Sequence, residues 1–199
     1  MHPAYLPLAH VLELLSECTM FVLGIKVGYS SPNTMTDMST KIKKGHKGDA
    51  TILKPTLMCC VPLILDRIYK NIIDSVNKRG SNFQKVFEFC YRYKLYWTKS
   101  GCNTPIIDKI IFNKIKALLG GRMRFVITGG APLSPETHDF IRVCLGLDLV
   151  QGYSLTETSC TGTCMQANDL STGRAGAPMA GLEIKLINWA EGNYRVTDR

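Results

Sequence analysis

A short apolar segment ends in a group of side chains that could bind a nucleotide. Residues 148–151 lead into Gly152 and Tyr153, and the hydroxyl of Thr156 and the carboxylate of Glu157 follow within a few positions. Glycine lets the backbone come close to a ligand, tyrosine offers a flat ring for stacking, and these oxygen atoms suit phosphate and magnesium. Considered alone, the segment fits a polar turn after a buried strand equally well.

A second segment favours the nucleotide interpretation. Residues 122–128 have the composition of a strand, and Gly129-Gly130-Ala131-Pro132-Leu133 follows directly. Ser134 then begins a helix, with a hydroxyl at the N-cap and a proline in the first turn, and this helix leads into residues 148–151. If the two strands are parallel neighbours, both turns lie at the edge where open α/β sheets bind ligands. The sequence therefore predicts an α/β fold with a site between the two turns.

The order of these side chains suggests how a nucleotide would lie. The Gly-Gly-Ala-Pro turn would expose backbone to a flat base, Tyr153 could stack on the base, and Thr156 and Glu157 lie further along toward the phosphates. Neither G-x-x-x-x-G-K-[ST] nor G-x-G-x-x-G occurs, and no Ser/Thr/Gly-rich loop ends in a lysine. The phosphates are therefore held in another way, or part of the protein lies outside these 199 residues.

A hydrolase is the rival interpretation of the same segment. Residues 152–156 resemble the nucleophile elbow G-x-S-x-G, with Ser154 as the nucleophile. That design needs a histidine after the serine and a helix directly after the turn, yet the last histidine is His138 and a Thr/Ser/Gly-rich stretch follows. The nucleotide site is therefore favoured. His138 and His10 are interpreted as core or boundary histidines when no other information is used.

Composition limits the protein to a few classes. The chain has 199 residues, 45% of them hydrophobic, and a net charge of +8, which fits one sizeable folded domain that could attract phosphates, anionic lipids or nucleic acid. The eight cysteines follow no secretory signal and are predicted to be small buried hydrophobes in a reducing compartment. Residues 8–27 carry too many polar side chains for a membrane-spanning helix, so we expect a mostly buried helix there.

The periodicity of apolar residues predicts the remaining elements. Helices are expected at residues 8–24, 63–78, 83–97 and 106–119, and strands at residues 25–29, 50–54 and 182–187. The aromatic and basic segment 83–97 could be a base-stacking surface, but its spacing favours an amphipathic helix. The basic loop 41–49 is interpreted as a solvated loop in preference to a phosphate or lipid contact.

Several motifs together resemble one family. They are Tyr5-Leu6-Pro7-Leu8-Ala9-His10-Val11-Leu12-Glu13, Gly45-His46-Lys47-Gly48-Asp49, Asp66-Arg67-Ile68-Tyr69-Lys70, the Gly129 to Pro135 turn, the Gln151 to Glu157 segment and Thr172-Gly173-Arg174-Ala175-Gly176-Ala177-Pro178. This set resembles the adenylate-forming acyl-CoA synthetases, and among them the long-chain fatty acid-CoA ligases. The resemblance covers nearly the whole chain and implies a partial open mixed sheet with flanking helices, a piece of the large N-terminal domain of such an enzyme.

The resemblance also implies a reaction and roles for particular residues. A fatty carboxylate would attack the α-phosphorus of ATP and expel pyrophosphate, and the acyl-adenylate would then be transferred to coenzyme A. Thr156 and Glu157 would be the catalytic residues, Thr156 binding phosphate and Glu157 binding Mg²⁺, while His10 would lie beside the acyl carboxylate. The residues implied to contact adenine are Gly130, Ala131, Pro132, Gln151, Gly152 and Tyr153.

The sequence departs from the family pattern at one site residue and lacks some of its segments. Ser154 stands where the family commonly has glycine. The phosphate loop would precede residue 1, and the ribose-binding aspartate, the catalytic lysine and the lid domain would follow residue 199. Residues 1–199 are therefore expected to be the central part of the AMP-binding domain and not competent for turnover alone. The alternative is a non-catalytic nucleotide- or fatty-acyl-binding fragment or pseudoenzyme.

The resemblance implies partners and a location as well. Fatty acid, ATP and coenzyme A are the expected ligands, and no nucleic acid is expected. The full-length protein is expected inside the cell at a membrane surface, of the endoplasmic reticulum, the mitochondrial outer membrane or the peroxisome.

Overall fold

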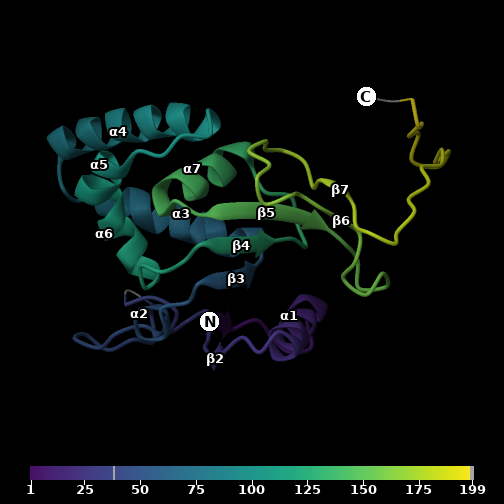
Figure 1. Cartoon of the computed structure of the whole chain (residues 1–199), viewed down its shortest axis with the longest axis horizontal. Coiled ribbons are helices and arrows are strands. Elements are labelled where there is room, and N and C mark those ends of the chain that lie inside the picture. The colour runs from purple at the N-terminus through teal and green to yellow at the C-terminus, as the bar shows by residue number, and fades with distance from the viewer. Residues whose placement is uncertain (38, 198–199) are drawn as a thin grey trace.

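A mixed sheet of five hydrogen-bonded strands forms the centre of the computed structural model, which describes residues 1–37 and 39–197 (Figure 1). Its strands follow the order β3-β4-β5-β6-β7. β3 pairs with β4 and β4 with β5 in parallel, whereas β6 and β7 continue the sheet antiparallel. The bounds are β3 Leu57–Cys60, β4 Phe125–Thr128, β5 Asp148–Tyr153, β6 Thr163–Cys164 and β7 Ala177–Pro178. The prediction of an α/β fold with an open mixed sheet and flanking helices is confirmed.

The amino-terminal segment lies beside the outer strand β3. β1 (His2–Ala4) and β2 (Val27–Tyr29) pair in parallel, and the helix α1 (Val11–Val22) connects them. The carbonyl oxygen of Met1 accepts a hydrogen bond of 2.9 Å from the backbone amide of Thr56, just before β3. The strand predicted near residues 25–29 is therefore present, and it extends the layer of strands beyond β3.

Three helices cover one face of the sheet and form the core with it. They are α3 (Pro62–Asn77), α4 (Ser81–Lys99) and α7 (Pro135–Leu145), with α4 outermost at the top of Figure 1. Phe140 of α7 is central to this layer, because its ring contacts Tyr69 at 4.4 Å and Tyr91 at 5.3 Å between ring centroids. Aromatic pairs at these separations stabilise a core beyond the burial of their area. The predicted helices at residues 63–78 and 83–97 are confirmed.

The helix predicted for residues 106–119 forms with an irregular centre. A π-helical turn interrupts it and allows two consecutive residues, Ile111 and Phe112, to be buried together. Gly120, with a φ of +80°, ends the segment as predicted. The stretch consists of α5 (Pro105–Ile107), the π-helix η1 (Asp108–Phe112), α6 (Asn113–Lys116) and the 3₁₀-helix η2 (Ala117–Leu119).

The strand predicted for residues 50–54 is wrong, because these residues belong to the short helix α2 (Asp49–Leu53). Asp37 causes the difference. Its carboxylate accepts hydrogen bonds from the amide of the N-cap residue Gly48 at 2.6 Å and from the Thr51 hydroxyl at 2.8 Å, which fixes the start of the helix. This contact depends on a residue twelve positions before the helix, so local alternation could not reveal it.

The strand predicted for residues 182–187 is also wrong. These residues have no regular structure and every one of them is exposed. In Figure 1 the chain beyond β7 runs away from the sheet. An alternating pattern becomes a strand only where a neighbouring strand supplies hydrogen bonds, and none lies beside this segment in the described part of the chain.

α1 differs from the mostly buried helix predicted for residues 8–27. It is shorter, and its inward side consists of Glu13, Ser16, Glu17 and Met20. The apolar side chains of Phe21 and Val22 are 60% and 86% exposed. The side predicted to face the core therefore largely faces outward. None of the described helices is both long and apolar enough to cross a membrane.

Candidate functional site at the carboxyl ends of β4 and β5

The turn after β4 is held at both ends by buried residues. Thr128 ends the strand fully buried, and Leu133 is 4% exposed where the chain enters α7. Between them, Gly130 has a φ of +83°, a conformation that favours glycine, and Ala131 and Pro132 are exposed. Ser134 caps α7 as predicted, since its hydroxyl oxygen accepts a hydrogen bond of 3.0 Å from the Thr137 amide. The turn therefore presents backbone and small side chains on a rigid support.

The turn after β5 lies beside the first turn. β4 and β5 are parallel with Thr128 opposite Gln151, so both strands end at the same edge of the sheet. A Cβ on Gly129 would lie 3.2 Å from the carbonyl oxygen of Gly152, and a Cβ on Gly152 would lie 3.1 Å from the carbonyl oxygen of Thr163. Glycine at both positions lets three backbone segments approach closely. The predicted meeting of the two turns at one edge is present.

Gln151 and Tyr153 offer different contacts at this edge. Gln151 is 9% exposed, and its buried side-chain oxygen has no hydrogen-bond partner within the described residues. A buried acceptor without a donor is costly, so a ligand N–H at this position would stabilise it. Tyr153 is 56% exposed, which leaves its ring free to stack on a ligand.

A tight turn carries Thr156 and Glu157 beyond β5. The Thr158 hydroxyl oxygen accepts a hydrogen bond of 3.0 Å from the Leu155 amide, and the Cys160 amide donates to the Leu155 carbonyl at 3.1 Å. Both Thr156 and Glu157 are exposed on this turn, and neither side chain has a hydrogen bond or ion pair within the described residues. Their oxygen atoms are therefore available to a ligand.

Ser154, in place of a glycine, is accommodated by the fold. Its backbone does not have a positive φ, so the residue type adds no strain of the kind that requires glycine. Its hydroxyl donates to the sulfur of Cys160 at 3.6 Å. The departure at this position therefore leaves the turn intact.

The same geometry argues against the hydrolase alternative. Residues 156–160 form a turn, whereas a nucleophile elbow continues directly into a helix. Ser154 donates to a cysteine, and His138 is buried in α7 against Arg142 and the carbonyl oxygen of Leu149. Ser154 and His138 therefore do not pair with each other.

An apolar cavity of about 180 Å³ lies between α1 and the two turns. α1 supplies the side chains of Leu12, Leu15 and Thr19, and β6 supplies Thr163 and Cys164. Burial raises the pKa of the Cys59 thiol, at the base of this cavity, to about 11, so the thiol is neutral at physiological pH. The cavity therefore offers an uncharged surface directly beside the turns, where Gly129, Gly152, Tyr153 and Ser154 complete its wall.

His10 is placed at the start of α1 and outside this cavity. Its side chain is exposed, and Nδ1 accepts a hydrogen bond of 3.2 Å from the Leu12 amide, which caps the helix. The core or boundary position predicted for His10 is wrong, because the ring is used at the helix terminus. Leu12, two residues later, does line the cavity, so α1 connects His10 to the site.

The predicted site contains one carboxylate, that of Glu157. The described residues contain no group of three or more His, Cys, Asp or Glu side chains that could hold a metal ion by themselves. Mg²⁺ commonly binds through one or two carboxylates together with water and substrate phosphates. Glu157 fits that mode, in which a nucleotide supplies most of the ligands.

Comparison with known proteins identifies the family. The profile of the family described as "AMP-binding enzyme" matches residues 2–198. The chain belongs to the AMP-binding enzyme family. Among curated AMP-binding relatives, long chain acyl-CoA synthetase 8 of Arabidopsis thaliana is 43% identical over 202 residues, which cover 98% of this chain and 28% of that protein.

Further relatives agree with this assignment. Long chain acyl-CoA synthetase 6, peroxisomal, of Arabidopsis thaliana is 36% identical over 98% of this chain and 27% of its own length. Long-chain-fatty-acid–CoA ligase 2 of Schizosaccharomyces pombe is 36% identical over 96% of this chain and 28% of its own length. The chain thus spans a little more than a quarter of these relatives.

Solved structures share the fold. Wild-type E. coli MenE with a bound analogue of OSB-AMS aligns with a TM-score of 0.53 and 19% identity, over 94% of this chain and 28% of that one. ATP-bound MatB from Rhodopseudomonas palustris aligns with a TM-score of 0.50 and 19% identity, over 90% of this chain and 26% of that one. At 19% identity, the structural likeness shows a shared fold and not a shared function.

The α1 and β6 walls of the site escaped the sequence interpretation. The mostly buried helix predicted for residues 8–27 does not indicate which of its side chains line a cavity, and the sequence predicts no element at residues 163–164. Gly162 was a usable signal for the second wall. A Cβ there would lie 2.1 Å from the carbonyl oxygen of Tyr153, which shows how closely β6 returns to β5.

Proposed function

We propose that residues 1–199 form the central part of the adenylation domain of a long-chain fatty acid-CoA ligase. The complete enzyme would activate a fatty acid with ATP to an acyl-adenylate and transfer the acyl group to coenzyme A. The names of the relatives support the substrate class. The observation that carries the proposal is the meeting of the two glycine-containing turns at one edge of parallel strands, where open α/β sheets bind ligands.

In this proposal the two turns hold the adenine. Backbone of Gly130, Ala131 and Pro132 lies on one side, and the ring of Tyr153 stacks on the base. Gln151 has an unsatisfied buried oxygen that could accept a hydrogen bond from an amino group of the base. Glycine at position 152 gives the backbone room here, because a Cβ would lie 3.1 Å from the carbonyl oxygen of Thr163.

Thr156 and Glu157 are proposed to act on the phosphates. The Thr156 hydroxyl would donate a hydrogen bond to a phosphate oxygen, and the Glu157 carboxylate would hold Mg²⁺. Bound Mg²⁺ would offset the negative charge that develops on the phosphates when the carboxylate attacks. Both side chains are exposed on a turn fixed by its own hydrogen bonds, which supports this role.

The acyl group is proposed to enter from the side of α1. The apolar cavity beside Tyr153 offers a surface for the alkyl chain, and His10 begins the helix that lines it. The ring of His10 lies outside the cavity wall. Its contact with the acyl carboxylate is therefore a separate part of the proposal.

The full-length protein is proposed to lie at an intracellular membrane. The endoplasmic reticulum, the mitochondrial outer membrane and the peroxisome are the candidates, and the peroxisomal names among the relatives support the last of these. Fatty acid, ATP and coenzyme A are its proposed small-molecule partners.

Calorimetric titration of the 199-residue chain with ATP and MgCl₂ tests the nucleotide site. Tyr153→Ala is expected to lower affinity by on the order of tenfold, because stacking on an aromatic ring contributes about 1–3 kcal/mol per base. Tyr153→Phe keeps the ring and is expected to retain affinity. Glu157→Ala is expected to remove the Mg²⁺-dependent part of binding and to leave metal-independent binding intact.

Glu183→Ala is the matched control, because Glu183 is an exposed carboxylate in the irregular segment beyond β7. Equal effects of Glu157→Ala and Glu183→Ala would contradict the metal role. Fatty-acid-dependent pyrophosphate release is expected to be negligible for the isolated chain, in which no Ser/Thr/Gly-rich loop ends in a lysine. Nucleotide binding without release in the complete enzyme would support a non-catalytic protein instead.

A further inference from the structure

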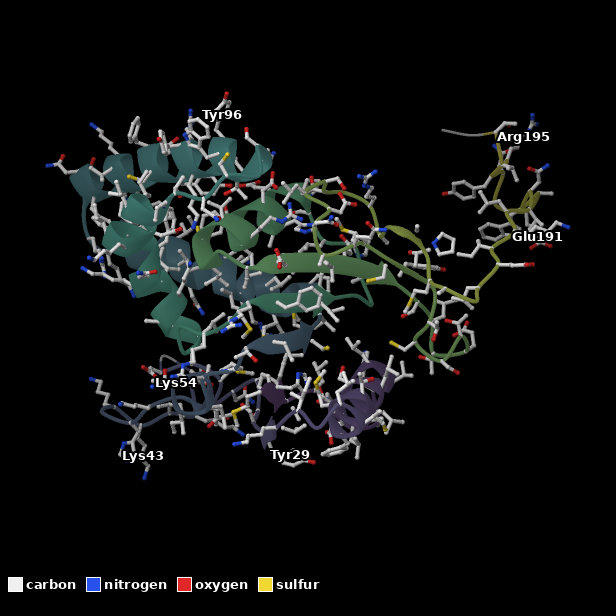
Figure 2. All side chains as sticks on the ribbon, in the orientation of Figure 1. Tyr29, Lys43, Lys54, Tyr96, Glu191 and Arg195 are labelled. Carbon is white, nitrogen blue, oxygen red and sulfur yellow. The ribbon has the colours of Figure 1, made fainter. Side chains whose placement is uncertain are left out.

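The outer side of α4 presents a continuous aromatic surface that the nucleotide site does not use. Five large side chains remain between 37% and 67% exposed along this helix. They are Val86, Phe89, Tyr93, Tyr96 and Trp97. We call this set the aromatic stripe. In Figure 2 the labelled Tyr96 projects from α4 away from the body of the protein.

The rings of the aromatic stripe lie side by side. Ring centroids are 6.5 Å apart for Phe89 and Tyr93, 6.1 Å for Tyr93 and Trp97, and 5.4 Å for Tyr96 and Trp97. Residues three and four positions apart lie on the same side of a helix, so the spacing from 86 to 97 produces one surface. The opposite side of α4 is already used, because Phe87 packs on Phe112 at 6.0 Å between centroids.

Basic residues run parallel to the aromatic stripe. Lys85, Arg92 and Lys99 recur every seven residues, are all exposed, and therefore form a second row along the helix. Arg92 pairs with Glu88 at 2.6 Å and Lys99 with Asp139 at 2.6 Å, while Lys85 makes no ion pair within the described residues. The Arg92 pair is exposed on both sides, so water and salt compete with it, whereas the Asp139 side chain that holds Lys99 is only 13% exposed.

This combination of side chains fits a membrane interface. Tyrosine and tryptophan prefer the headgroup region of a bilayer, where an apolar ring and a polar tip are both satisfied. Helices that lie in the plane of a membrane have aromatic or aliphatic residues on one side and Lys or Arg on the other. A large exposed apolar surface also indicates an interaction site in a soluble domain.

Two other exposed surfaces have either apolar side chains or basic residues, but not both. The outward side of α1 is apolar, with Leu14 and Phe21 50% and 60% exposed, but residues 11–22 contain no lysine or arginine. The loop at residues 41–49 has four lysines but no aromatic residue. Charge complementarity to an anionic surface together with aromatic anchors therefore distinguishes α4.

We propose that α4 lies flat on an anionic lipid bilayer, with the aromatic stripe in the interfacial layer and Lys85 and Arg92 at the lipid phosphates. This names the face and the lipid chemistry of the membrane partner in the proposed function. It requires neither ATP nor fatty acid. Failure of nucleotide binding and failure of lipid binding are therefore separate results.

Co-sedimentation of the 199-residue chain with vesicles tests the proposal. The probe is phosphatidylcholine vesicles with and without phosphatidylserine. Binding is expected to require phosphatidylserine and to fall with added salt. Neutralising Lys85 and Arg92 together, as Lys85→Gln with Arg92→Gln, is expected to lower binding by about tenfold or more, since each basic residue contributes roughly fivefold.

A second variant tests the aromatic stripe directly. Phe89→Ser with Tyr96→Ser is expected to lower binding by on the order of tenfold or more, because both side chains lose apolar area that would be buried in the interface. The two residues are each 67% exposed, so the fold should be retained, which circular dichroism checks. If this variant unfolds, the Lys85 and Arg92 neutralisation still decides the question, because both of those side chains are exposed.

Matched controls come from the two rejected surfaces. Phe21→Ser removes an exposed aromatic from α1, and Lys43→Gln with Lys44→Gln removes two charges from the basic loop, which lies across the view from Tyr96 in Figure 2. Both controls are expected to bind vesicles as the unchanged chain does. The proposal is overturned if the controls lose binding while the α4 variants keep it, or if no vesicle binds. It is also overturned if Phe89→Ser with Tyr96→Ser leaves vesicle binding unchanged and abolishes self-association, as measured by analytical ultracentrifugation.

Discussion

His138 is a fully buried residue whose position makes a specific pH dependence measurable. The guanidinium of Arg142 lies 2.8 Å from its Nε2, and the carbonyl oxygen of Leu149 lies 2.9 Å from the same nitrogen. Burial lowers the pKa of His138 below its usual value of 6.5, and the Arg142 charge lowers it further, against the opposing effect of Leu149. The interpretation of His138 as a core or boundary histidine is therefore confirmed.

The sign of the resulting pH effect follows from the lowered pKa. The unfolded chain binds a proton at His138 near pH 6.5, whereas the folded chain binds it only at lower pH. The stabilising contribution is full above pH 6.5 and is lost as the pH falls through the folded pKa. Nearby Asp169 does not interfere, because its hydrogen bonds to Ser171 lower its pKa to about 2, far below this window.

Urea unfolding of the unchanged chain and of His138→Gln at pH 7.5 and pH 5.5 measures this contribution. The unchanged chain is expected to lose more unfolding free energy than the variant between the two pH values. The other histidines are common to both proteins, so the difference between them isolates His138. Identical losses would show that the ring titrates alike in the folded and unfolded chains.

At the scale of elements, α1 depends on a histidine cap that also lies next to the proposed acyl site. His10→Ala removes the acceptor for the Leu12 amide and is expected to lower the unfolding free energy by about 1 kcal/mol. His10→Asn supplies another side-chain acceptor and is expected to keep the stability. Thermal unfolding of both variants measures this.

A binding measurement then separates the two possible roles of His10. If the ring also contacts the fatty carboxylate, His10→Asn should keep the fold and weaken binding of a fluorescent fatty acid. A cap alone would leave fatty-acid binding unchanged in that variant. Loss of stability in His10→Asn equal to that in His10→Ala would contradict the capping role.

The elements that could be predicted from the sequence are those whose signals are local. Ser134 and Gly146 bound α7 with their own conformations, and the turns around Gly129 and Gly152 carry the residues their geometry requires. The orientation of α1 could not be predicted in the same way. An apolar periodicity shows that the two sides of a helix differ, but not which of them packs on the sheet. In this orientation the buried Glu13 lies 3.6 Å from His2 of β1 and accepts a hydrogen bond of 3.0 Å from the Leu6 amide, contacts that periodicity does not report.

At the scale of the whole molecule, the site is assembled from segments far apart in the chain. α1, β4, β5 and β6 each contribute a wall, so no single stretch of sequence contains the cavity. The two turns were predictable because both follow strands that pair in parallel within one local unit. The remaining walls depend on contacts over many residues, which periodicity does not report.

The carboxyl-terminal segment is expected to be independent of this assembly. Residues 182–197 contribute no member to the buried core cluster, and Ile187 and Trp189 are 74% and 57% exposed. Within the segment the rings of Trp189 and Tyr194 stack at 6.0 Å between centroids, and at its start the Leu182 amide donates a hydrogen bond of 3.1 Å to the Met179 carbonyl. Met179, which lines the cavity, is held instead by a hydrogen bond of 2.9 Å from its amide to the Gly162 carbonyl.

A chain ending at Gly181 is therefore expected to have an unfolding free energy within about 0.5 kcal/mol of that of the 199-residue chain, as is usual for changes at exposed positions. Limited trypsin digestion of the longer chain is expected to cut first after Lys185, because an exposed irregular segment fits a protease more readily than helices do. Urea unfolding and mass spectrometry of the first fragments measure the two outcomes. A large loss of stability on shortening, or first cuts within α3 or α7, would show that this segment supports the sheet.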